Sequence, residues 1–210
     1  MEKEGYAPNN QIKIYTNGVF DLFHYGHVKF LEKCKKSFHF VYLIVGICSD
    51  SDVKNAKGKT VMTAEERGEV VKNCIWVDEV IINCKLPFHL EDLDKLGCKY
   101  IAHDPEPYPY IGTDDVYGEF KKASRFLPIE RSGDISTTTI INRILFDYDI
   151  YLERNIIKGL KPKELNVTNN RYFGIKINLM WKNIKLRTSK IPLMFYFIKW
   201  RGKSKVLKDD

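Results

Sequence analysis

The sequence has no long apolar run. Its wholly apolar stretches are short pieces such as residues 40–45, far below the roughly 20 residues that a membrane-spanning helix needs. The first residues, Met1-Glu2-Lys3-Glu4, are polar and lack the apolar core of a secretory signal. Low-complexity linkers and internal repeats are also absent. With 44% hydrophobic and 13% aromatic residues, the chain is expected to be a soluble globular protein with an α/β core of one or two domains.

Paired cysteines are missing as well. The five cysteines are widely spaced, and no two of them form a C-x-x-C pair, so neither a disulfide framework nor a zinc site is indicated. We expect reduced, mostly buried thiols and an intracellular, cytoplasmic location, with a peripheral membrane or nuclear location as further options. The cysteines are Cys34, Cys48, Cys74, Cys84 and Cys98.

Charge is unevenly distributed. The formal net charge is +7, but residues 171–210 hold 11 basic and 2 acidic side chains, whereas residues 1–170 hold 23 basic and 25 acidic ones. The first 170 residues therefore resemble a near-neutral enzyme domain, and the basic character belongs to a tail.

Short apolar runs alternate with amphipathic segments, a pattern typical of parallel βαβ units. The sequence predicts a Rossmann-like, doubly wound, parallel five-stranded sheet with helices on both faces and a C-terminal extension. We expect an arm (1–11), a catalytic domain (12–147), a wrap-around extension (148–170) and a basic aromatic tail (171–210). The expected strands are 12–16, 40–48, 77–82, 99–102 and 126–129. The expected helices are 28–35, 63–74 (opened by a Thr63/Glu66 capping box), 90–96 (closed by Gly97), 115–124 and 136–146.

The loop after the first expected strand runs from Gly18 to His27 and enters a helix. It carries His24 and His27 three residues apart, with Gly26 allowing close approach to the backbone. A helix start adds unpaired N–H donors and the positive end of a dipole, so this loop could bind an anion. The alternative is one core histidine and one surface histidine.

A second loop, residues 131–138, also runs from a strand into a helix. Arg131 can bind phosphate oxygens with its fork of donors, and Ser136 or Thr137 can cap the helix and donate to the same anion. The alternative is a plain helix cap beside a surface arginine. Two such loops at the carboxyl edge of one sheet favour a polyphosphate ligand.

These motifs carry a resemblance. His24-x-Gly-His27 after Gly18-Val-Phe-Asp, with Trp76-Val-Asp-Glu-Val80, His103-Asp104 and Arg131-x-x-x-Ile-Ser136-Thr, resembles the cytidylyltransferase family of the HxGH nucleotidyltransferase superfamily. Further matches at Asp114-Asp-Val-Tyr117, Asp147-Tyr-Asp149, Arg154-Asn155 and Lys163-Glu-Leu-Asn-Val167 are similar to its choline-phosphate members.

The resemblance implies transfer of the cytidylyl group of CTP to phosphocholine, giving CDP-choline and pyrophosphate for phosphatidylcholine synthesis. It implies His24, His27, Lys57 and Arg131 as catalytic residues. The implied CTP-binding residues are Val19, Phe20, Asp21, His24, His27, Lys57, His103, Asp104, Tyr108, Glu130, Arg131, Ser132, Ile135, Ser136 and Thr137. The implied phosphocholine-binding residues are Lys57, Tyr108, Asn17 and Phe88. Asp21 is expected to fix a loop. Mg²⁺ is implied with the triphosphate, without a dedicated carboxylate cage.

The sequence departs from the family pattern where headgroups are discriminated. Ile75 replaces the usual arginine before Val-Asp-Glu-Val, Asn17 replaces an acidic residue, and a tryptophan is missing near Leu86-Pro-Phe88. Two alternatives stay open: a phosphoethanolamine enzyme, and a catalytically weakened membrane- or nucleotide-binding regulator.

The tail interleaves basic and aromatic residues, and its apolar positions fit either a helical face or a strand. By resemblance it binds an anionic membrane surface. Packing back on the domain or its dimer mate, and RNA binding, are the alternatives, RNA being the weakest. The resemblance also implies a homodimer, with the first loop and the Val-Asp-Glu-Val segment at the subunit contact.

Overall fold

The computed structural model describes residues 11–110, 113–130 and 135–188 of the chain, with side chains described as far as residue 184. The chain divides into two compact units, residues 1–141 and 142–210. The first unit holds the β-sheet, and the second holds the last two described helices.

Five parallel strands form one sheet in the order β3-β2-β1-β4-β5. The central strand pairs with β2 from Ile12↔Val41 to Gly18↔Ile47 and with β4 on its other side. The predicted Rossmann-like, doubly wound sheet is confirmed. The strands are β1 (Ile12–Gly18), β2 (Val41–Cys48), β3 (Glu79–Cys84), β4 (Tyr100–His103) and β5 (Phe126–Pro128).

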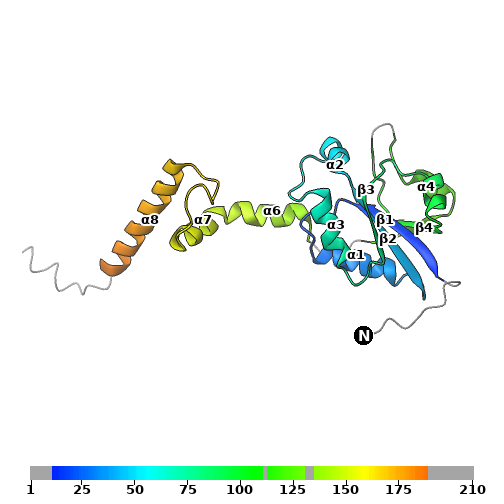
Figure 1. Cartoon of the computed structure of the whole chain (residues 1–210), viewed down its shortest axis with the longest axis horizontal. Helices are drawn as coiled ribbons and strands as arrows, with labels where there is room; N and C mark the ends of the chain where they lie inside the picture. Colours follow the sequence, from blue (N-terminus) through cyan, green and yellow to red (C-terminus); the bar gives the residue numbers. More distant parts are fainter. Residues whose placement is uncertain (1–10, 111–112, 131–134, 189–210) are drawn as a thin grey trace, which may run out of the picture. The chain divides into compact units, whose positions relative to one another are not determined.

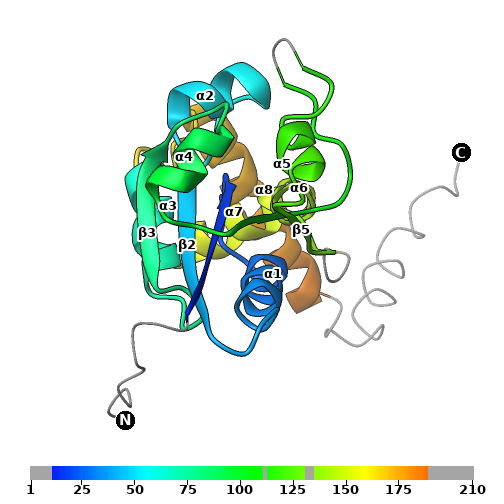
Figure 2. The same ribbon diagram turned by 90° about the vertical axis from the view of Figure 1, so that its right-hand side faces the viewer.

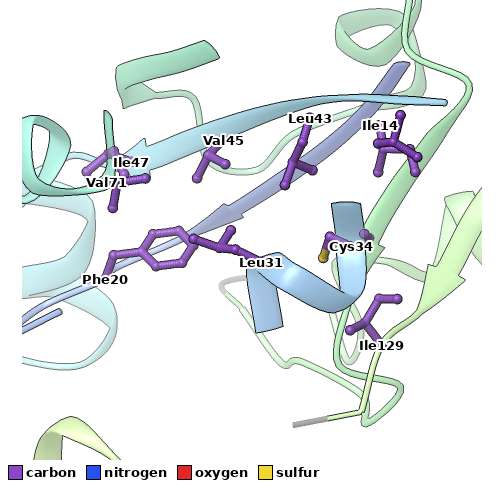
Figure 3. Packing of buried hydrophobic residues seen from close by; sticks show 11 residues of the cluster. Ile14, Phe20, Leu31, Cys34, Leu43, Val45, Ile47, Val71 and Ile129 are labelled. Atoms are coloured by element: carbon purple, nitrogen blue, oxygen red, sulfur yellow. The ribbon is translucent and has the colours of Figure 1, made fainter. Parts of the chain in front are cut away.

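Helices cover both faces of this sheet (Figure 1). The covering helices are α1 (Tyr25–Lys35), α3 (Ala64–Lys72), α4 (Leu90–Lys95) and α5 (Gly118–Lys122). Two further helices are α2 (Asp50–Ala56), which follows β2, and α6 (Thr137–Phe146), which crosses the boundary between the units. On one face, Leu31 of α1 and Val71 of α3 pack with Leu43 in the larger core (Figure 3). On the other face, Leu93 of α4 and Phe120 of α5 close a second core.

Capping residues in the sequence mark the ends of several helices. The predicted capping box is present at α3, where Thr63 Oγ1 accepts the N–H of Glu66 at 3.2 Å and the Glu66 carboxylate accepts the N–H of Thr63 at 2.8 Å. Gly97 follows α4 with a left-handed φ of 64°. Helix α1 begins at Tyr25, three residues before the expected start, because His24 caps it.

One helix was not predicted, and one is shorter than predicted. Helix α2 was not expected, although Ser49 caps it by accepting the N–H of Asp52 at 3.1 Å. The helix expected over 115–124 spans only Gly118–Lys122, because Asp115 Oδ1 accepts the N–H groups of Tyr117 and Tyr108 and holds the preceding residues in a turn.

All five cysteines are free thiols, four of them buried and Cys74 half-buried, which confirms the expected thiol state.

The strand order reverses at β1, whose two neighbours are β2 and β4. Because all strands are parallel, their carboxyl ends lie on one edge of the sheet. Figures 1 and 2 both show α2, which follows β2, at the same end of the unit as the loop that follows β4. A crevice at such a reversal is the usual ligand site of open α/β sheets.

The second unit is built from α7 (Tyr148–Ile157) and α8 (Asn169–Thr188), so the ambiguous period in the tail resolves as a helix up to residue 188. Arg171 of α8 pairs with Asp149 of α7 at 2.7 Å, and Lys182 pairs with Glu153 at 2.7 Å. Within the described ranges, no helix has both the length and the apolar character needed to cross a membrane.

Candidate functional site

The loop after β1 is fixed by the buried carboxylate of Asp21. It accepts the N–H groups of Leu22 at 3.1 Å, Val61 at 2.8 Å and Met62 at 3.0 Å. The loop includes two non-glycine residues with positive φ, Phe20 at 55° and Leu22 at 46°. Asp21 therefore joins the first loop to the segment before α3, in the loop-fixing role expected from the sequence.

Two stacked imidazoles stand at the start of α1. The ring centroids of His24 and His27 are 3.8 Å apart. The Nδ1 of His24 accepts the N–H of Gly26 at 3.1 Å, and the Nδ1 of His27 accepts the N–H of His24 at 3.3 Å. Because each Nδ1 is an acceptor, each neutral ring carries its proton on Nε2. The capping contacts thus fix both tautomers.

His24 offers a donor that lacks a partner. Its Nε2 is buried and makes no hydrogen bond to any described residue. Burial also lowers the pKa of His24 below its ordinary value, so the ring is neutral at pH 7. A buried polar atom without a partner is costly, and an anion bound at this point would satisfy it.

The start of α6 lies against the start of α1. Thr137 Oγ1 donates to the carbonyl of Asp21 at 3.0 Å. A Cβ added to Gly26 would lie 3.1 Å from the carbonyl oxygen of Ile135, so the two backbones are in close approach there. Ser136 Oγ accepts the N–H of Thr139 at 3.1 Å and caps α6. Two helix N-termini with their dipoles therefore meet beside the histidine pair.

Part of the second expected loop lies outside the described residues. This applies to Arg131 and Ser132, which stay predictions from the sequence. Their neighbour Glu130 is exposed, and its carbonyl accepts from Lys33 Nζ of α1 at 2.9 Å. The residues on both sides of this gap therefore contact the α1 region.

An aromatic cluster lies beyond β4. His103 stacks on Tyr117 at 4.4 Å and meets Tyr108 edge to face at 6.0 Å. Tyr117 donates its hydroxyl hydrogen bond to Asn17 Oδ1 at 2.8 Å, which links this cluster to the end of β1. Lys57, at the end of α2, places its Nζ 4.7 Å from the centre of the Tyr108 ring. Lys57 after α2, His103 at the end of β4 and two tyrosines of the segment after β4 are thus brought together.

One residue expected at the headgroup site is buried. Phe88 was expected to line a headgroup pocket, but it is only 7% exposed and stacks on Tyr15 at 4.3 Å within the second core. Its ring packs in this core, and its contact with a headgroup stays a prediction from the sequence. Asp104, by contrast, stays at the loop, where it accepts the N–H of Glu106 at 3.3 Å.

Sequence reasoning missed two residues. Tyr117 is buried and contacts Asn17 and His103. From the sequence it was identified only as the last residue of the Asp114-Asp-Val-Tyr117 motif, with no role at the site. Arg67 of α3 is fully buried and donates to the carbonyls at the ends of β1 and β2. In the sequence, Arg67 follows two glutamates, a pattern typical of a solvated helix face. The only feature that could have indicated a role for Arg67 is its nearness to the Thr63 capping box.

The comparisons with known proteins identify the family. A family model described as cytidylyltransferase-like matches residues 15–143. Choline-phosphate cytidylyltransferase A of Rattus norvegicus is 45% identical over 157 residues, which make up 75% of this chain and 43% of the relative. Choline-phosphate cytidylyltransferase of Saccharomyces cerevisiae is 46% identical over 157 residues, 75% of this chain and 37% of the relative.

A relative with a different named headgroup is more distant. The probable ethanolamine-phosphate cytidylyltransferase of Schizosaccharomyces pombe is 34% identical over 139 residues, which make up 66% of this chain and 38% of the relative. The chain therefore spans less than half the length of each of these three relatives.

Proposed function

Because the chain belongs to the cytidylyltransferase-like family, we propose that it transfers the cytidylyl group of CTP to phosphocholine, giving CDP-choline and pyrophosphate for phosphatidylcholine synthesis. One observation carries the proposal: the stacked His24–His27 pair stands where the start of α6 meets the start of α1. A triphosphate needs such a set of fixed donors, and a neutral metabolite does not.

The proposed chemistry is an in-line displacement. A phosphate oxygen of phosphocholine bonds to the α-phosphorus of CTP, and the bond from that phosphorus to the bridging oxygen of pyrophosphate breaks. The Nε2–H groups of His24 and His27 would donate to the oxygens on which negative charge grows. Neither ring needs to act as a base, because a phosphate monoester is already a nucleophile near neutral pH.

The remaining roles follow the family resemblance. Lys57 would lie between the α-phosphate and the incoming phosphate. Arg131, Ser132, Ser136 and Thr137, with Glu130 and Ile135 beside them, would hold the β- and γ-phosphates. The nucleoside would lie among the Val19 and Phe20 backbone, Asp21, His103, Asp104 and Tyr108.

Magnesium is proposed as a companion of the triphosphate. Over the described ranges, no group of three or more His, Cys, Asp or Glu side chains could hold a metal ion. Those residues do not fit a protein-held metal, so the ion would arrive on CTP, and no step above uses a protein–metal bond.

Two observations favour choline as the headgroup. The two choline-named relatives are 45% and 46% identical to this chain, against 34% for the ethanolamine-named one. Tyr108 presents its ring face to a cation, because Lys57 Nζ lies 4.7 Å from its centre. The headgroup site would rest on Tyr108, Lys57, Asn17 and Phe88, of which Asn17 and Phe88 are buried.

The test is formation of CDP-alcohol from CTP with each phosphorylated headgroup. We expect CDP-choline to form with a higher kcat/KM than CDP-ethanolamine. A preference for phosphoethanolamine would overturn the headgroup assignment. Binding of CTP by calorimetry without either product would instead support the weakened regulator.

Variants at His27 test the donor role. His27→Ala should lower turnover at least ~100-fold, as loss of a transition-state donor does. Because His27 Nδ1 also accepts the N–H of His24, this variant loses a helix cap as well. His27→Gln keeps an acceptor in the capping position, so it should retain stability and still lose turnover. Normal turnover in both variants would place the chemistry elsewhere.

Two partners belong to the proposal. The exposed apolar side chains of α8, which include Phe173, Ile177 and Trp181 among basic residues, support binding to an anionic membrane surface. Sedimentation with anionic vesicles that weakens with salt is expected, and equal sedimentation with neutral vesicles would refute it.

The dimer is supported by Ile75, which is 83% exposed beside the Val-Asp-Glu-Val segment. Sedimentation equilibrium tests it, and a monomer at micromolar concentration would contradict it.

A further inference from the structure

A buried arginine joins the segments that carry the candidate catalytic groups. The side chain of Arg67 is fully buried. Its Nη1 donates to the carbonyl of Val19 at 2.5 Å, its Nη2 donates to the carbonyl of Cys48 at 2.9 Å, and its Nε donates to the carbonyl of Met62 at 3.3 Å. One guanidinium therefore binds the backbone of three segments that are distant in the sequence.

The charge of this guanidinium is balanced by Asp50. Arg67 Nη2 donates to Asp50 Oδ1 at 2.6 Å, and Asp50 Oδ2 accepts the N–H of Ala64 at 3.2 Å. The Arg67 guanidinium holds the pKa of Asp50 below its ordinary value. Asp50 is the first residue of α2, so the contact anchors the start of that helix to α3.

Two of the three bound segments lead to a candidate catalytic group. Val19 precedes the loop that carries His24, and Cys48 ends β2 directly before α2. Helix α2 is only seven residues long and ends at Ala56, so its anchored first residue lies two turns from Lys57, the capping residue at its other end. The orientation of α2 therefore decides where the Lys57 ammonium lies.

We propose that Arg67 is a positioning residue for the transfer reaction: it holds the ends of β1 and β2 together, so that Lys57 and the histidine pair face the same phosphate. The inference rests on the proposed function for the identity of that phosphate. A planar fork of donors can bind three carbonyls and a carboxylate at once, and a lysine ammonium cannot reproduce this geometry.

A double-mutant cycle tests whether Arg67 acts through Lys57. Arg67→Lys should lower kcat at least about 10-fold at saturating substrates, whereas the same change in a Lys57→Ala background should lower it less than about 2-fold. The loss of thermal stability should be the same in both backgrounds. An equal loss of kcat in the two backgrounds would overturn the proposal, because Arg67 would then act only on the fold.

A matched control exists on the other side of the unit. Arg125 also donates to two carbonyls, those of Lys99 and Cys98, and pairs with Asp94 at 2.5 Å. Arg125→Lys should lower stability and leave kcat unchanged. A loss of kcat in this control equal to that in Arg67→Lys would refute a special role for Arg67.

A second measurement follows the NMR resonance of Lys57. It depends neither on turnover nor on a substitution at the buried Arg67. In protein with ¹³C-methylated lysines, the Lys57 resonance is identified by its absence in Lys57→Ala, and the Tyr108 ring shifts it. Asp50→Asn, at a carboxylate that is 47% exposed, should move this resonance toward that of solvent-exposed lysines. The matched variant Asp94→Asn, at 65% exposure, should leave it in place.

An unmoved resonance in Asp50→Asn would refute the positioning of Lys57, whatever the activity. If the wild-type protein forms no CDP-alcohol but the resonance moves as expected, the proposed function fails and the structural link between the arginine pair and Lys57 stands.

Discussion

At Gly26 the two helix starts are in close approach, and its substitution separates the geometry of the site from the stability of the fold. In Gly26→Ala, the new Cβ would lie 3.0 Å from His24 Cε1, 3.1 Å from His24 Nδ1 and 3.1 Å from the carbonyl oxygen of Ile135. These contacts are short by a few tenths of an ångström, so the His24 ring or the start of α6 must move. Alanine is also favoured over glycine inside a helix by about 1 kcal/mol.

The short contacts of the new Cβ lower stability, whereas the higher helix propensity of alanine raises it. Only the short contacts are expected to affect catalysis. We expect the free energy of unfolding of Gly26→Ala to lie within about 1 kcal/mol of the wild type, because helix propensity offsets part of the steric cost. Turnover should fall about 10- to 100-fold, since a displaced donor loses about 1.4 to 2.7 kcal/mol of transition-state stabilisation. Urea unfolding and steady-state assays measure the two quantities.

The control for this substitution is Gly174→Ala in α8, where an added Cβ meets no atom within 4 Å. This variant should gain stability and keep its turnover. If Gly26→Ala kept full turnover with an unchanged KM for CTP, the closeness of the two helix starts would not matter for the reaction.

Three further predictions concern titratable groups. Burial raises the pKa of Cys34 to about 12, so a thiol reagent at pH 8 should label Cys74 in the folded protein and Cys34 only after unfolding; equal labelling rates by mass spectrometry would contradict this. Two neighbouring lysine ammonium groups lower the pKa of Glu32 to about 2, so its stabilising contribution is complete above pH 4.5 and is lost as the pH falls toward 2. Glu32→Gln should therefore flatten the acid side of the stability curve in urea titrations, and an unchanged curve would show that the ion pairs contribute nothing. Because burial lowers the pKa of His24, the ring stays neutral, and its part in turnover intact, until the pH falls below 6.5; a turnover that already halves at pH 6.5 through His24 would refute the lowered pKa.

The strands were predictable because burial on both faces leaves a distinct signal. Residues 40–48 form a nearly continuous apolar run, as expected for a central parallel strand, and β2 indeed pairs with β1 and β3. Helix starts with a side-chain oxygen and a glutamate in capping-box spacing were also predictable, as at Thr63. Helix α2 was missed because seven mostly polar residues carry too little periodicity to distinguish a helix from a loop.

The site was only partly predictable for a related reason. Motif spacing placed His24 and His27 at a helix start, but it carried no information on the direction in which an aromatic or charged side chain points. Phe88 was expected at the headgroup and lies in the core, and Arg67, for which no role was predicted, is fully buried. Both depend on tertiary packing, which a local pattern does not encode.

The histidine pair shows why a local stability device and a catalytic device coincide in this fold. The atoms that cap α1 are the two Nδ1 atoms, and their acceptor role leaves each proton on Nε2. A serine or aspartate at the capping position would hold the helix equally well, but it would present no donor on the side away from the cap. A lysine would present a donor but no acceptor for the cap, and its charge would carry a larger desolvation cost at a partly buried position. A neutral imidazole satisfies both demands, and its two ring nitrogens divide them between the helix and the ligand.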